Sequence, residues 1–67
     1  MNFIKGTRNG CFRTGQWAKI NGVVMSKDDA GHQLCFVVEF IDGYMDEWPI
    51  YSSGYGYEFS DGSDLHA

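Results

Sequence analysis

The chain has 67 residues, of which 43% are hydrophobic and 16% aromatic, and its formal net charge is −4. This length allows one domain, and the apolar content excludes a disordered chain. No apolar run is long enough to span a bilayer or to act as a secretion signal, so we expect no contact with a membrane.

The first fifteen residues contain little regular pattern. Residues 1–10 are predicted to form an N-terminal arm, because glycine and polar residues interrupt any period. Residues 11–13 permit a short strand, and Thr14-Gly15 then marks a turn.

Residues 16–25 are the first long strand candidate. Their even positions, which include Ile20 and Val24, are predicted to face the core. Asn21-Gly22 permits either a hairpin turn or a bulge within one bent strand. The flanks are short for two separate strands, which favours the bulge.

Residues 26–32 are polar and are predicted to form a loop. Residues 33–42 follow as the central strand, and Asp42-Gly43 marks a tight turn because glycine accepts positive φ without steric cost. The core face of this strand is predicted to hold Phe36, Val38 and Phe40. Residues 46–51 return antiparallel, and this strand is predicted to lie at a sheet edge or to stop near Pro49, because proline cannot donate a ladder hydrogen bond.

The C-terminal part is predicted to close the domain. Residues 52–56 form a loop, residues 57–59 a short strand or a single turn of helix, and residues 60–67 a flexible tail. Residues 11–59 thus form an all-β domain of four or five short strands. We expect either a small SH3-like barrel or a strongly bent antiparallel sheet.

Two cysteines, Cys11 and Cys35, are too few for a disulfide scaffold. Without a secretion signal, reduced thiols are the expected state, and Cys35 lies in an apolar run typical of a buried residue. We therefore expect a cytoplasmic protein.

The sequence predicts neither a metal site, nor a cofactor, nor an enzyme. The soft metal ligands lack the paired spacing of zinc sites; they are Cys11, His32, Cys35 and His66. No nucleophile motif, phosphate loop or dinucleotide fingerprint is present.

A binding surface is the functional feature that the sequence favours most. Aromatic and acidic residues alternate around the last hairpin and loop, namely Asp42, Tyr44, Asp46, Glu47, Trp48, Tyr51, Tyr55 and Tyr57. Ring faces attract cations and carboxylates pair with them, so this mixture suits a cationic ligand. Trp17 and Trp48 suit the core or rim of a small barrel equally well, and the sequence does not choose between these placements.

Two resemblances add to this interpretation. Val38-Glu39-Phe40-Ile41-Asp42, followed by Gly43 and Tyr44, is similar to the strand and turn of Tudor-like, SH3-like domains. That resemblance implies a bent five-stranded barrel whose aromatic cage often binds methylated lysine or arginine.

The second resemblance rests on Thr14–Ala18, Cys35–Val38, Phe40–Gly43, Asp46–Pro49 and Tyr57–Phe59. This pattern resembles short uncharacterised proteins of bacteriophages and prophages, which implies a phage-like origin but no particular activity.

The charge distribution completes the functional prediction. Residues 1–19 carry +4 and residues 20–67 carry −8. We therefore expect a non-catalytic interaction module that binds a basic surface of a host protein in the host cytoplasm. The narrower form of this prediction is an inhibitor of a nucleic-acid-binding or defence protein. The alternatives are an assembly protein that self-associates through edge strands and a nucleic-acid module built on the basic arm, which the net charge disfavours.

Overall fold

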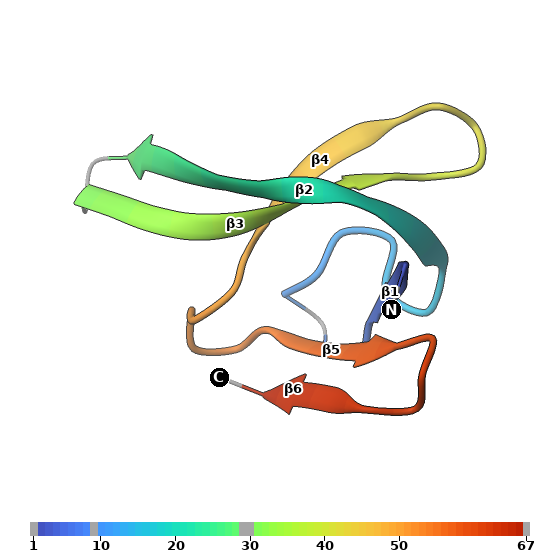
Figure 1. Cartoon of the computed structure of the whole chain (residues 1–67). Coiled ribbons are helices and arrows are strands. Elements are labelled where there is room, and N and C mark those ends of the chain that lie inside the picture. The colour runs from blue at the N-terminus through green and yellow to red at the C-terminus, as the bar shows by residue number, and fades with distance from the viewer. Residues whose placement is uncertain (1, 9, 29–30, 67) are drawn as a thin grey trace.

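The computed structural model describes residues 2–8, 10–28 and 31–66, and it contains one six-stranded antiparallel sheet (Figure 1). The strands are β1 (Phe3–Gly6), β2 (Trp17–Asp28), β3 (Gly31–Glu39), β4 (Met45–Pro49), β5 (Gly56–Phe59) and β6 (Asp64–His66). Their order across the sheet is β4-β3-β2-β1-β5-β6. The sheet stays open, with β4 and β6 at its edges, so the bent sheet and not a closed barrel is the architecture.

Strand β1 lies in the middle of this sheet. It pairs with β2 through Phe3 opposite Lys19, and with β5 through Ile4 opposite Phe59. The prediction of an N-terminal arm therefore differs from the structure over residues 3–6. Four residues are too few to display a strand period, although complete burial of Ile4 fixes the strand against the core.

Strand β2 contains the predicted bulge. Its register with β3 shifts between Ile20, which is opposite Val38, and Gly22, which is opposite Val37. An extra residue in one strand reverses which side chains face the core beyond it. Beyond the bulge Val23 and Val24 are both exposed, at 53% and 38%, so Val24 does not face the core as predicted, whereas Ile20 packs against the core.

The hairpin of β2 and β3 is longer than the sequence predicts. Ser26–Asp28 and residues 31–32 belong to the strands, with Lys27 opposite His32, while residues 29–30 of the predicted loop lie outside the described residues. Both faces of this end of the hairpin are accessible to solvent, so its residues are polar. The segment therefore lacks the alternation of apolar and polar residues that predicts a strand. In Figure 1 the hairpin extends beyond β5 and β6.

The remaining strands agree with the sequence except at the C-terminus. Strand β4 is an edge strand that ends at Pro49, as predicted, and residues 56–59 form a strand rather than a helical turn. The predicted tail instead forms β6, which pairs with β5 through Leu65 opposite Tyr57. Asp61 stabilises the intervening turn by accepting hydrogen bonds from the amide and hydroxyl of Ser63.

The core lies where the bent sheet brings β4 over β5. The rings of Trp48 and Tyr57 stack with centroids 5.6 Å apart and planes 2° apart. Phe36 meets the edge of Tyr57 at 5.8 Å, and the Tyr57 hydroxyl donates a hydrogen bond to the carbonyl of Pro49. The buried core cluster comprises Ile4, Cys11, Ala18, Val38, Phe40, Trp48, Tyr57 and Phe59. Cys11 and Cys35 are both buried thiols and do not form a disulfide with each other.

Candidate functional site

The aromatic residues of the predicted binding surface do not form one patch. Trp48 and Tyr57 are 2% and 1% exposed and belong to the core. Tyr55 is half-buried and stacks on Tyr57, with the ring centroids 6.3 Å apart. Tyr44 and Tyr51 are exposed, but they flank opposite ends of β4. Only Tyr51, at 76%, is largely exposed, because Tyr44 is 44% exposed and packs against Phe12 with the ring centroids 5.3 Å apart.

The acidic residues of that predicted surface are used in different ways. The Asp46 carboxylate accepts a hydrogen bond from Trp48 Nε1 at 3.1 Å and another from the Glu47 amide at 2.9 Å. Asp42 forms an ion pair with Arg13 at 2.9 Å. Glu47 itself is exposed on β4. Two of the three carboxylates around β4 thus serve internal contacts.

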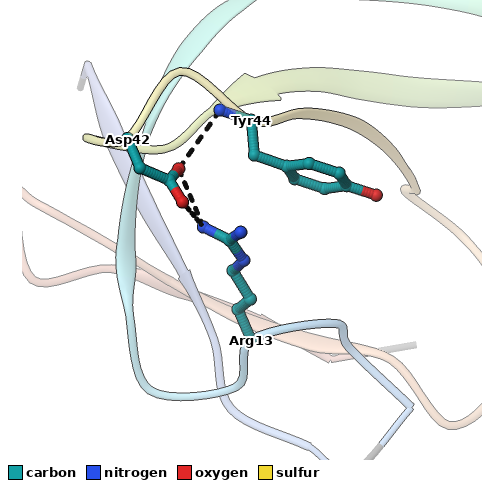
Figure 2. A network of polar contacts seen from close by, with 3 residues as sticks. All are labelled: Arg13, Asp42 and Tyr44. Carbon is teal, nitrogen blue, oxygen red and sulfur yellow. Dashed lines mark hydrogen bonds and ion pairs between the residues drawn. The ribbon is translucent and has the colours of Figure 1, made fainter.

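Arg13 anchors the loop between β1 and β2 to the turn between β3 and β4 (Figure 2). Its guanidinium carbon lies 4.7 Å from the ring centre of Tyr44 and 4.8 Å from that of Phe40. Phe12 approaches from the same loop at 5.4 Å. Three aromatic rings and a carboxylate therefore surround one cation beside the β3–β4 turn, and that cation belongs to the chain itself.

This contact, which we call the Arg13 clamp, comprises Arg13, Asp42, Tyr44, Phe40 and Phe12. Asp42 Oδ1 also accepts a hydrogen bond from the Tyr44 amide at 3.1 Å. The Arg13 hydrogen bond first, and the Tyr44 amide second, hold the pKa of Asp42 below its ordinary value. The hydrogen bond to Asp42 raises the pKa of Arg13. Arg13 and Asp42 therefore both carry their charge at neutral pH.

The strand register defines a second candidate surface, the outer face of the sheet. Residues directly opposite each other in antiparallel strands point to the same side, as do residues two apart in one strand. Two rows cross the sheet, one from Met45 through Glu39 and Lys19 to Phe3, and one from Trp17 through Lys5 and Glu58 to Asp64. We call outer face the part of this side that consists of the two rows and the residues next to them, Phe3, Lys5, Trp17, Lys19, Val37, Glu39, Met45, Glu47, Glu58 and Asp64.

The outer face combines acidic and aromatic groups. It carries four carboxylates and two ammonium groups, which gives a net charge of −2. Lys5 is held by Glu58 at 3.7 Å and lies 4.9 Å from the ring centre of Trp17. Phe3 and Trp17 remain 46% and 44% exposed. An acidic, aromatic surface is therefore present on the outer face, outside most of the residues predicted around β4.

A hollow of about 370 Å³, the Trp17 hollow, opens at one end of the outer face. Its lining is Phe3, Trp17, Lys19, Glu39, Phe40 and Ile41. Ile41 stands beside it on the β3–β4 turn and is fully exposed. Sequence reasoning missed Phe3 and Ile41, although an isoleucine directly before the Asp42-Gly43 turn, where polar residues prevail, was a usable signal.

A second hollow of about 330 Å³ lies at the far end of the β2–β3 hairpin. Its lining is Met25, His32, Gln33, Leu34 and Tyr51, and the Tyr51 ring beside it is 76% exposed. Together the two hollows place apolar side chains at opposite ends of the long strands.

Within the described parts of the chain, no three His, Cys, Asp or Glu side chains lie close enough together to hold a metal ion. The same residues include no helix of the length and apolarity needed to cross a membrane. In comparisons with known proteins, the chain matches no family, no curated protein and no solved structure.

Proposed function

We propose that this chain is a small, non-catalytic interaction module that binds a basic partner protein through the outer face of its sheet. The observation that carries the proposal is the exposure of Phe3, Trp17 and Ile41 around one hollow on an acidic face. Clustered exposed apolar residues with a polar surround are typical of protein-binding surfaces, and tryptophan is a frequent anchor of binding energy.

The excess of carboxylates determines the kind of partner. The outer face carries a net −2 and the whole chain −4, so a basic surface gains favourable long-range attraction and an acidic one is repelled. A phage-type protein in the host cytoplasm would use such a face to cover a basic surface of a host protein. A nucleic-acid-binding or defence protein is the narrower form of this proposal, because carboxylates can occupy positions that phosphates would take.

The self-association alternative has less support at edge strand β4. The Phe40 amide donates a hydrogen bond to the Tyr44 carbonyl, and the Ile50 amide donates one to the Leu34 carbonyl. Backbone groups of successive residues in a strand point in opposite directions, so the amides of Met45 and Glu47 point away from β3. The Glu47 amide is taken by Asp46, and Pro49 has no amide proton. Such features protect an edge from pairing with another strand.

The nucleic-acid alternative also has less support. Of the four basic residues in the first nineteen, Lys5 pairs with Glu58 and Arg13 with Asp42. Lys19 is opposite Glu39 in the register. Few cations therefore remain to neutralise phosphates.

The experiment compares immobilised wild-type protein with the variant Glu39→Gln, Glu47→Gln in capture from cell extract. We expect the wild type to enrich basic proteins that are released by salt, and the variant to lose most of them. A matched control carries Thr7→Lys and Ser53→Lys, which change the net charge equally but lie in exposed loop positions outside the outer face. Equal capture by all three proteins, or enrichment of acidic proteins, would contradict the proposal.

A further inference from the structure

We propose that the Trp17 hollow receives one large apolar side chain from a short linear segment of a partner, and that Lys or Arg residues flank this side chain. The inference rests on the proposed function and specifies where and how the partner is anchored. It depends on three properties of the site: its size and lining, the rigidity of the turn that presents Ile41, and the carboxylates beside it.

The size and lining of the hollow suit a single anchoring side chain. Its volume of about 370 Å³ is near the lower end of the range for ligand pockets, roughly 300–1,000 Å³. Phe3, Trp17 and Ile41 provide exposed apolar walls on three separate segments of the chain. An inserted leucine, methionine or phenylalanine would remove these walls from water together with itself, which is the arrangement that concentrates binding energy in a few residues.

The turn that presents Ile41 is fixed before any partner binds. The Phe40 amide bonds to the Tyr44 carbonyl at 2.8 Å, and the Gly43 amide bonds to the Phe40 carbonyl at 2.9 Å. Arg13 of the clamp donates a hydrogen bond at 2.9 Å to Asp42, the residue directly after Ile41 (Figure 2). Because this turn is held in place, little conformational entropy is lost when Ile41 contacts a partner. The clamp thereby acts as a positioning device for the hollow.

The charges beside the hollow select the flanking residues of the segment. Glu39 lines the hollow, and its carboxylate accepts a hydrogen bond from Asn21 Nδ2 at 2.9 Å, which holds it in place. Glu47 is exposed further along the same face. Lys19 also lines the hollow and repels cations. Basic residues of the segment are therefore favoured only where they extend away from Lys19 toward Glu39 and Glu47. A segment with one apolar residue and basic neighbours on one side fits this distribution.

The experiment selects binders from a displayed library of random twelve-residue peptides on the wild-type protein and then measures the affinity of the enriched peptides. We expect a consensus of one large apolar residue with Lys or Arg nearby. We also expect a blue shift of tryptophan emission on binding, because Trp17 is exposed in the free protein whereas Trp48 is already buried in the core. Ile41→Asn should weaken binding at least tenfold, because it removes an apolar wall of the hollow. The substitution should not disturb folding, because the position is fully exposed and the turn accepts asparagine. Tyr51→Asn, at the other hollow, is the matched control and should leave affinity within about twofold.

Several outcomes would overturn the inference. Peptides that bind Ile41→Asn as tightly as the wild type would show that the apolar side chain does not enter the Trp17 hollow. The proposed interaction module would still be supported if the capture experiment gave its expected result. Failure to enrich any peptide would exclude a linear segment as the occupant. Tight binding of a twelve-residue oligothymidylate with loss of Trp17 fluorescence would assign the hollow to a nucleic acid instead. Circular dichroism of both variants establishes that they are folded.

Discussion

Arg13 adopts a backbone conformation that disfavours residues with a side chain. Its φ of +57° makes it the one non-glycine residue with positive φ among those the structure describes. The conformation directs the guanidinium into the Arg13 clamp, where an ion pair with Asp42 and three aromatic rings hold it. Backbone strain at one residue is thus offset by contacts that join two distant segments of the chain.

Replacing Arg13 with glutamine should raise the pKa of Asp42 toward its ordinary value near 3.9. The hydrogen bond from Arg13 is the largest cause of the lowered pKa, so the pKa should rise when it is removed, while the hydrogen bond from the Tyr44 amide remains. A group with a lowered folded-state pKa stabilises the protein above its unfolded pKa, and this stabilisation is lost as pH falls through the folded value. The stability difference between wild type and variant should therefore narrow below about pH 4. Carboxyl NMR titration measures the pKa directly.

Asp61 provides the internal control for that titration. Hydrogen bonds from the Ser63 hydroxyl and amide lower the pKa of Asp61, and none of these groups contacts Arg13. Its titration should be unchanged in Arg13→Gln. An Asp42 titration that is equally unchanged would show that Arg13 does not pair with it in solution.

At the scale of secondary structure, strand length decides how well the sequence predicts an element. Residues 16–25 and 33–42 are long enough to display alternation, and both correspond to strands of the sheet. β1 and β6 have four and three residues, too few to display a period. The place of β1 depends on pairing with β5, which is distant in sequence, and β6 is recognised as a strand only by its pairing with the preceding β5. The glycine at position 22 made the bulge at Asn21-Gly22 predictable. Which side chains of β2 point to each side of the sheet beyond the bulge depends on the register with β3, and the sequence does not reveal that register.

Gly6 is the point where β1 meets the loop that carries the Arg13 clamp. A Cβ atom at this position would lie 2.5 Å from Cys11 Cβ and 3.1 Å from Cys11 Sγ. Gly6→Ala should therefore lower the free energy of unfolding by about 1–3 kcal/mol, as overpacking of a core does. Urea denaturation followed by circular dichroism measures this change.

Gly22→Ala is the matched control because no atom lies within 4 Å of the added Cβ. It should change the free energy of unfolding by less than about 0.5 kcal/mol. In the double variant Gly6→Ala, Cys11→Gly, the contact with Cys11 is removed, so the two substitutions should cost less together than the sum of their separate effects. Strict additivity would contradict the origin assigned to the Gly6 effect.

At the scale of the molecule, the sequence predicts the chemical character of the surface, acidic and aromatic, better than it predicts which residues form that surface. An all-β, bent sheet with an acidic and aromatic surface follows from composition, turns and strand patterns. Which rings are buried depends on how the sheet bends, and this bend stacks Trp48 on Tyr57 and removes both from the predicted surface. Phe3 reaches the outer face only because β1 inserts between β2 and β5, and β1 and β5 lie more than fifty residues apart in the sequence.

Strand β1 joins the two halves of the sheet, which makes residues 2–6 essential to the whole molecule rather than a removable arm. Its loss would leave β2 and β5 without their shared neighbour and would remove the fully buried Ile4. We expect deletion of residues 2–6 to abolish the cooperative urea transition and the near-ultraviolet circular dichroism of the packed aromatic rings. Deletion of residues 64–67 removes only edge strand β6, so that variant should keep a cooperative transition at a lower urea midpoint. If the first deletion unfolds with wild-type cooperativity, β1 cannot be the element that connects the two halves.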